Sequence, residues 1–434
     1  MWTSGSGRGW AVGVVAAAAI LLGGCGSDGA LASTEVKADA TRAVPSEGGQ
    51  ADVQALAADN ADFAWDLYGV LARKDADANL FASPHSISQA LAMAFAGARG
   101  ETATEMAAAL HYRIDQDRLH SAFNALEAAL TPPKEAPGKD PAPLRLNIAN
   151  SAWAQKDHPF ERAFLETLAV NYGAGVRLID FARDPEAARE TINDWVSERT
   201  EERVKDLLPE GSITGLTRLV LANAVYFKAD WTHPFTKDAT QPGPFTTRTG
   251  TSVEVPMMRQ QASFAYGRVG GVEAVELPYA DGRASMVVLL PPAGGFDAFE
   301  AGLDGAGVRA LLSSLKPATV NLALPKFEFT AEFSLKEALE ALGMKAAFEP
   351  ERSDFSGMDG TRELFVSGVF HKAFVRVDEK GTEAAAATAV VLTGTSAPLD
   401  VVQLTVDRPF VFLIRDTRTG AILFAGRVTN PVAK

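Results

Sequence analysis

The sequence of 434 residues contains only one cysteine, Cys25, and therefore no internal disulfide bond. Packing and hydrogen bonds must hold the folded part together, even in an oxidising compartment. Long apolar runs are scarce as well. Residues 11–22 form an apolar run of twelve residues, which is too short for a transmembrane helix. These absences exclude a disulfide-stapled scaffold and a membrane span at 11–22.

Positive charge is also in short supply. Lys and Arg number 41 against 54 Asp and Glu, which leaves a net charge of −13 and no basic cluster along the chain. This balance argues against nucleic acid, a polyanion or an anionic membrane surface as the main partner. At 47% hydrophobic and 22% charged residues, the composition is that of a globular protein with ample material for a large core.

Motifs of catalysis and cofactor binding are missing too. None of the six histidines pairs with another at metal-binding spacing, and no phosphate-binding glycine loop or Gly-x-Ser-x-Gly turn is present. Hydroxyls do flank a histidine in Ser83-Pro84-His85-Ser86, but neighbours at a helix start do not face one another. We expect no cofactor and no enzyme activity. A hydrolase remains an alternative, to be revived by ester turnover that is lost on mutating Ser83 or Ser86.

The N-terminus has the features of a targeting segment. Arg8 precedes the apolar run 11–22, and Leu22-Gly-Gly-Cys25 resembles a bacterial lipobox, in which the cysteine is lipidated and becomes the new N-terminus. The alternative is a plain secretory signal with a chance cysteine. We expect a signal peptide over 1–25 and an exported lipoprotein of the cell envelope, membrane-anchored or extracellular.

The next segment, 26–54, is rich in Gly, Ser, Ala, Asp, Glu and Pro and is predicted to be a flexible linker. From residue 55 to 432 we expect one folded domain. Helical periodicity dominates its first half and strand patterns its second, which indicates an α+β fold. Among the expected elements are a helix over 185–208 and strands over 217–228, 320–329 and 404–415. The strand over 217–228 is almost wholly apolar and should be central, covered on both faces.

The stretch Asp378–Pro398, DEKGTEAAAATAVVLTGTSAP, fits neither a loop nor a core. Its alanines favour a helix, yet the β-branched residues that follow favour a strand. In a strand, Thr382 and every second residue after it would share one face, all uncharged, while Glu383 would lie on the other face. An Ala-rich surface helix is the alternative, but it explains neither the missing charges nor the β-branched end.

Ordered motifs along residues 55–432 resemble the serpins, a family of serine protease inhibitors. These motifs are Asn79–Ile87 (NLFASPHSI), Ala90–Ala94, Gly97–Thr102 (GARGET), Leu221–Lys228 (LANAVYFK) with Trp231 and Pro234–Phe235, Leu324–Phe327, Leu342–Met344, Asp354–Met358, His371–Phe374, Asp407–Phe410, Gly426–Val428 and Asn430–Pro431. The resemblance implies three β-sheets, a set of about eight or nine helices and an exposed reactive-centre loop. A protease cleaves this loop, which then enters the main sheet as an extra strand; serpins are themselves a standard example of such insertion.

Site residues follow from the same resemblance. The hinge of the loop would comprise Glu379, Gly381, Thr382, Glu383, Ala384, Ala385, Ala386, Ala387 and Thr388. A polar cluster that controls sheet opening, the shutter, would comprise Ser83, Ser86, Asn223 and His371. The alternative is that these four merely satisfy one another's buried hydrogen bonds. Trp231 would mark the breach at the top of the sheet, although Ala229-Asp230 replaces the Gly and basic residue common in relatives.

The family's usual hinge length implies that the scissile bond is Thr395–Ser396. No Lys or Arg occurs between the hinge and Arg408, so a trypsin-like target is not expected. Thr395 suits a shallow pocket, which favours an elastase-like protease, then a subtilisin-like one, and third a chymotrypsin-like cut after Leu392. The implied function is suicide-substrate inhibition by a monomer that forms a covalent complex with its serine protease. A non-inhibitory serpin that acts as a binding protein is the alternative.

Overall fold

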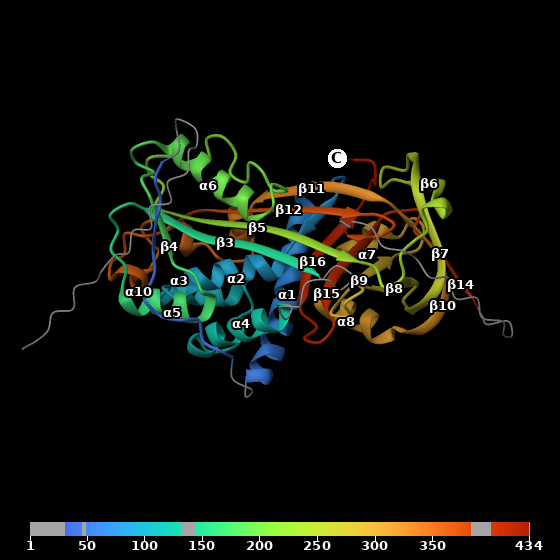
Figure 1. Ribbon diagram of the computed structural model, residues 1–434, viewed down its shortest axis with the longest axis horizontal. Helices are drawn as coiled ribbons and strands as arrows, with labels where there is room; N and C mark the ends of the chain where they lie inside the picture. The colour runs from blue at the N-terminus through green and yellow to red at the C-terminus, as the bar shows by residue number, and fades with distance from the viewer. Residues whose placement is uncertain (1–30, 46–48, 132–143, 383–400, 434) are drawn as a thin grey trace, which may run out of the picture.

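The computed structural model describes residues 31–45, 49–131, 144–382 and 401–433 (Figure 1). Its α-helices are α1 (Gln50–Lys74), α2 (Pro84–Phe95), α3 (Gly100–Ala109), α4 (Gln116–Leu130), α5 (Arg162–Tyr172), α6 (Pro185–Arg199), α7 (Phe296–Ala301), α8 (Gly305–Ser314), α9 (Lys336–Ala341) and α10 (Ser356–Asp359). Its strands are β1 (Thr34–Val36), β2 (Leu80–Ala82), β3 (Arg145–Gln155), β4 (Val176–Ile179), β5 (Leu219–Asp230), β6 (Gln241–Thr246), β7 (Ser252–Val269), β8 (Val272–Pro278), β9 (Ala284–Leu290), β10 (Lys316–Pro325), β11 (Phe327–Ser334), β12 (Val366–Val377), β13 (Gly381–Thr382), β14 (Val402–Thr405), β15 (Phe410–Asp416) and β16 (Ile422–Val428). The fold is mixed α+β, as the sequence predicts.

The main sheet has seven strands in the order β1-β4-β3-β5-β13-β12-β11. Its central strand β5 confirms the expectation of a strand covered on both faces. Val220 and its alternate neighbours pack against α6, whereas Leu219 and Leu221 belong to the core shared with α2. Figure 1 shows α6 above this sheet and α2 below it.

Two hydrogen-bonded sheets, rather than the expected three, form in the described part of the chain. The second sheet has nine strands because β7 runs without a break for eighteen residues. Its first third pairs with β6, its middle with β10 and its end with β8. Hydrogen bonding is therefore continuous across all nine strands, which form one sheet.

Helix number and one helix length also differ from expectation. Eight or nine helices were expected, and the described residues form ten α-helices. The helix predicted over 185–208 ends at Arg199, because the hydroxyl of Thr200 donates back to the Val196 carbonyl at 2.8 Å and Glu201 and Glu202 adopt φ angles of 53° and 58°. The later apolar residues of that stretch are still buried against α6, which is why the sequence pattern continued past the helix end.

Two stretches that were each predicted to be one strand form two strands in the structure. The stretch 320–329 breaks at Lys326, where the chain passes from the second sheet (β10) to the main sheet (β11). The stretch 404–415 breaks before β15 at Pro409, which has no N–H to donate to a ladder. Buried apolar residues flank both breaks, so the prediction continued each strand across the short polar interruption.

The prediction of a flexible linker over 26–54 is wrong for much of its length. Strand β1 pairs antiparallel with β4 at the edge of the main sheet, and α1 already begins at Gln50. The carboxylate of Glu35 accepts from the Gly175 N–H at 3.1 Å and pairs with Arg177 at 3.2 Å. At Gly175 an added Cβ would collide with the Val36 carbonyl, so glycine permits this close approach.

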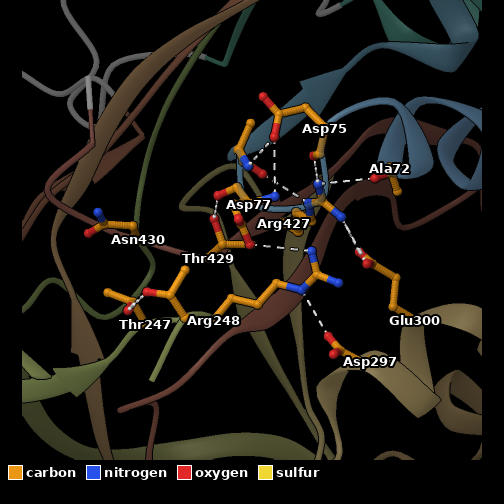
Figure 2. Close-up of polar contacts among 12 residues, drawn as sticks. Ala72, Asp75, Asp77, Thr247, Arg248, Asp297, Glu300, Arg427, Thr429 and Asn430 are labelled. Atoms are coloured by element: carbon orange, nitrogen blue, oxygen red, sulfur yellow. Dashed lines mark hydrogen bonds and ion pairs between the residues drawn. The ribbon is translucent and has the colours of Figure 1, made fainter. Parts of the chain in front are cut away.

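A buried arginine explains the Gly426-Arg427-Val428 motif of β16 (Figure 2). The guanidinium of Arg427 is 1% exposed and donates to both carboxylate oxygens of Glu300 at 2.8 Å. Its other donors meet main-chain carbonyls at the end of α1, including that of Ala72 at 3.3 Å and that of Asp75. A buried charge is tolerated only with such complete pairing, so Arg427 joins α1, β16 and α7.

No helix among the described residues has the length and apolarity needed to cross a membrane.

Candidate functional site

Two hinge residues already lie in the main sheet. Strand β13 sits between β5 and β12, with Gly381 opposite Asp230 and Thr382 opposite Ala229. A Cβ on Gly381 would collide with the main chain of Ala229, so glycine is required at this seam. The rest of the hinge, from Glu383 to Thr388, lies outside the described residues.

Thr382 is held in the sheet by its side chain as well as its main chain. It is 1% exposed, and its hydroxyl lies 2.7 Å from the hydroxyl of Tyr279. Tyr279 is fully buried, and burial raises the pKa of its phenol far above the usual value, so it remains protonated and able to donate. Thr382, the first residue on the face predicted to enter the sheet, therefore has its hydroxyl hydrogen-bonded.

Trp231 fixes the turn that leads into the hinge. Its N–H donates to the Lys380 carbonyl at 2.8 Å, and its indole N–H donates to the Asp378 carbonyl at 3.0 Å. The indole ring stacks on Tyr279 with centroids 4.6 Å apart. The predicted breach residue therefore contacts the hinge directly, although Ala229-Asp230 stands where relatives commonly have another pair.

Glu379, the first predicted hinge residue, is anchored by two donors. The Lys326 ammonium lies 2.8 Å from one carboxylate oxygen, and the Thr240 hydroxyl lies 2.9 Å from the other. Burial acts to raise the pKa of Glu379, but the hydrogen bonds from Lys326 and Thr240 outweigh it and lower the pKa below its usual value. Since Lys326 lies at the break between β10 and β11, this pair ties the hinge to both sheets.

The four predicted shutter residues come together in one buried cluster. The Ser83 N–H donates to His371 Nε2 at 3.1 Å, and Asn223 Nδ2 donates to the Ser86 hydroxyl at 2.6 Å. His371 Nδ1 contacts Asn223 Oδ1, and the Ser86 N–H donates to the Ser83 hydroxyl at 3.3 Å. Ser83 and Ser86 are brought there by α2, which Ser83 caps and Pro84 begins.

The cluster spans the seam between β5 and β12. Asn223 and His371 are direct partners in the register of these two parallel strands. Burial lowers the pKa of His371 to about 3, so its imidazole is neutral at physiological pH. Because Nε2 accepts from Ser83, the proton resides on Nδ1 and is donated to Asn223.

Two residues of the network were not identified from sequence. Asn150 on β3 stands opposite Asn223, accepts from its amide and from the Ser86 hydroxyl, and donates to Gln89 Oε1 at 3.0 Å. Gln89 lies in α2, within a stretch dominated by apolar residues. The available signal was Gln89, the one amide side chain in a mostly apolar helix, whereas Asn150 is one of several polar residues in β3 and gave no such signal.

The same cluster lacks the geometry of a hydrolase. The Ser83 hydroxyl donates to the Leu423 carbonyl at 2.7 Å and the Ser86 hydroxyl to Asn150 Oδ1 at 3.2 Å, so neither donates to a histidine. The ring of His85 is buried without a hydrogen-bond partner, and burial lowers its pKa to about 4. A serine nucleophile needs a base in hydrogen-bond contact, and these serines have none.

Within the ranges described, no group of three or more His, Cys, Asp or Glu side chains lies close enough together to hold a metal ion.

Besides Glu383 to Thr388 of the hinge, three more predicted functional residues lie outside the described residues. They are the lipidation candidate Cys25 and the two residues of the expected scissile bond, Thr395 and Ser396.

Comparisons with known proteins agree with this geometry. The family model described as serpin (serine protease inhibitor) matches residues 58–431. An uncharacterized serpin-like protein of Thermococcus kodakarensis is 40% identical over 372 residues, 85% of this chain and 84% of that protein. Leukocyte elastase inhibitor of Homo sapiens is 37% identical over 390 residues, 87% of this chain and 100% of that protein. The native-state crystal structure of the thermophilic serpin tengpin has a TM-score of 0.78 at 29% identity, covering 91% of this chain and 97% of that one.

Proposed function

Because this chain belongs to the serpin family of serine protease inhibitors, we propose that it inhibits its target as a suicide substrate. The protease serine attacks the Thr395 carbonyl, the Thr395–Ser396 peptide bond breaks with Ser396 leaving as the amine, and Thr395 remains as an ester on the protease, as in any acyl-enzyme intermediate. The cleaved loop then extends β13 down the seam between β5 and β12. The tethered protease is carried along and distorted before water can complete hydrolysis.

The single observation that carries this proposal is the position of β13. Thr382 already occupies the seam with its side chain inward, against Tyr279. If the strand continues, every second residue after Thr382 will face inward too. In this sequence those residues are Ala384, Ala386, Thr388, Val390 and Leu392. They are uncharged, and the first three are small enough to pass between existing strands.

The proposed target is an elastase-like serine protease. Thr395 at the primary specificity position suits a shallow pocket, and the curated relative from Homo sapiens is named for inhibition of leukocyte elastase. A subtilisin-like target is the second choice, and a chymotrypsin-like cut after Leu392 the third. The inhibitor is proposed to act as a monomer.

A lipid on Cys25 is proposed to hold the inhibitor at the cell envelope. The Leu22-Gly-Gly-Cys25 sequence supports this, since it resembles a lipobox and contains the only cysteine of the chain. The inhibitor would then meet its protease at a membrane surface.

The test is a panel of serine proteases, each incubated with the purified chain and analysed by denaturing electrophoresis. An elastase-like protease should give a complex that resists SDS, with cleavage at Thr395–Ser396. A Thr395→Arg variant is the matched control, and it should shift the complex toward trypsin-like proteases. Cleavage with no complex from any protease would leave only the non-inhibitory binding function. Ester turnover lost in Ser83→Ala or Ser86→Ala would instead indicate a hydrolase.

A further inference from the structure

Residues 31–45, here called the N-terminal strap, bind the edge of the main sheet. Besides the β1–β4 pairing, the Leu31 N–H donates to the Thr191 hydroxyl of α6 at 3.1 Å. The Lys37 ammonium donates to the Gly173 carbonyl at the end of α5 at 2.5 Å. These contacts fix the first half of the strap to the β5 side of the insertion seam.

The second half of the strap binds α4. Arg42 donates to Asn124 Oδ1 at 2.7 Å and to both carboxylate oxygens of Glu127 at 3.0 and 2.8 Å. The Asn124 amide donates back to the Ala43 carbonyl at 2.8 Å. Bidentate pairing of this kind fixes both direction and distance. The strap is therefore attached at two places, one on the sheet and one on a helix beneath it.

Arg42 is connected to the shutter by an unbroken series of hydrogen bonds. Glu127 Oε2, which Arg42 holds, accepts from Gln89 Nε2 at 2.7 Å. Gln89 Oε1 accepts from Asn150 Nδ2 at 3.0 Å, and Asn150 Oδ1 accepts from Asn223. Asn223 then meets His371 across the seam.

We propose that the N-terminal strap is a brake on opening of the main sheet, with Arg42 as its positioning residue. The inference rests on the proposed function, because opening matters only if a loop inserts. A new strand between β5 and β12 must break the Asn223–His371 contact. It must also let β5, β3 and β4 shift relative to α2 and α4. The strap resists that shift because it binds β4 at one end and α4 at the other.

The hydrogen-bond series adds a second source of resistance. While Arg42 holds Glu127, the carboxylate keeps Gln89 directed at Asn150, and Asn150 keeps the amide of Asn223 in place. Loss of Arg42 leaves Glu127 free to turn toward solvent, since its side chain is 29% exposed. Gln89 and Asn150 are then no longer fixed, and the Asn223–His371 contact breaks more readily.

The opening rate can be measured without any protease. A fluorescent synthetic peptide with the sequence of residues 382–395 can enter the seam only when the sheet opens. We expect Arg42→Ala, in the full chain purified in detergent, to raise the rate of peptide insertion roughly tenfold. Arg118→Ala is the matched control, because Arg118 also joins α4 to a carboxylate, Asp52 of α1, but among the described residues no hydrogen bond connects that pair to the shutter. It should leave the rate unchanged.

A double-mutant cycle separates action through the shutter from simple loosening of the strap. In a Gln89→Met background the connection is already broken, so adding Arg42→Ala should raise the insertion rate by far less than tenfold. Full additivity of the two changes would refute the hydrogen-bond series. Equal insertion rates for wild type and Arg42→Ala would refute the brake as a whole. By contrast, no peptide insertion into any variant, and no stabilisation after loop cleavage, would refute the proposed function itself.

Discussion

The hydroxyl groups of Thr382 and Tyr279 lie 2.7 Å apart in the interior of the protein, which holds the first inward-facing hinge residue inside the main sheet before any cleavage. Insertion therefore does not have to begin from an exposed loop. In the proposed mechanism it would extend a strand whose first two residues already pair with β5 and β12. The first strand residues are thus already ordered in the native protein, so insertion would not have to order them again.

Cleavage of the reactive-centre loop should stabilise the protein. An inserted strand of about eleven residues gains hydrogen bonds worth ~0.5–1.5 kcal/mol each, enough to rival the ~5–15 kcal/mol stability of an ordinary domain. We expect the melting temperature to rise by roughly 20 °C after a cut between Val391 and Ser396. Calorimetry of intact and cleaved protein checks this. A cleaved protein that melts at or below the intact temperature contradicts insertion.

Replacing Thr382 by arginine should turn the inhibitor into a substrate. Thr382 is already buried in the native sheet, so Thr382→Arg should displace β13 from the seam. After cleavage, insertion would then have to bury an unpaired charge at a cost of several kcal/mol, and hydrolysis of the acyl-enzyme would finish before insertion does. Cleavage at Thr395–Ser396 should continue while active protease is released and the covalent complex falls at least about tenfold. The yield of complex per cleavage event is the measurement.

The matched control for that change is Glu383→Arg, one residue further along the chain. Alternation in a strand directs this side chain to the opposite, solvent-facing side, so inhibition should be nearly unchanged. Tyr279→Phe provides a milder test, since it removes one hydrogen bond to Thr382 without adding charge. Equal loss of inhibition in Thr382→Arg and Glu383→Arg would contradict the alternation on which the mechanism depends.

Mild acid should destabilise the native state through His371. Its pKa is lowered from 6.5 to about 3 by burial, so the unfolded chain binds a proton that the folded protein does not. The stabilising contribution of the neutral imidazole is complete above pH 6.5 and is lost as the pH falls toward 3. At pH 5 the loss amounts to about 2 kcal/mol from this residue.

The measurement is the melting temperature between pH 7.5 and 4.5, and His371→Gln should flatten its dependence on pH. Some dependence will remain, because burial also lowers the pKa of His85 and His120 to about 4. Ser83→Ala is the control: it removes a hydroxyl of the same cluster but no titrating group, so the slope should persist. A His371→Gln profile parallel to wild type contradicts this assignment.

Membrane association should depend on Cys25. If the cysteine is lipidated, Cys25→Ser will move the protein from the membrane to the soluble fraction, and mass spectrometry of the wild-type N-terminus will detect the lipid. An unchanged distribution between fractions, with no lipid found, contradicts the anchor and leaves a secretory signal.

The sequence predicted those parts of the fold in which the pattern of apolar and polar residues along the chain matches their burial in the folded protein. Strand β5 is apolar because both its faces are covered, and the shutter residues were placed by motifs that stand in order along the chain. The breaks at Lys326 and Pro409 were missed because burial continues on both sides of them. Gln89 and Asn150 were missed because their partners lie on other elements, brought near only by packing of α2 against β3 and β5.

The strap was missed for a related reason. Its composition is that of a linker, and its order comes from partners more than 80 residues away, such as Glu127 and Gly175. A segment with little apolar surface can be ordered when it pairs with the edge strand of a sheet and when its arginine forms a bidentate ion pair with a carboxylate. Composition describes only what the segment itself contributes.

If Cys25 carries a lipid, the docked strap would also limit the distance between the folded domain and the membrane. A free linker over 26–54 could extend about 100 Å at ~3.5 Å per residue, whereas a docked strap leaves only residues 26–30, or about 18 Å. With lipid on Cys25, the inhibitor would then lie against the bilayer, oriented by the point at which Leu31 meets α6. The protein would then inhibit only a protease that acts close to the bilayer surface, and a protease further from the membrane would not be inhibited.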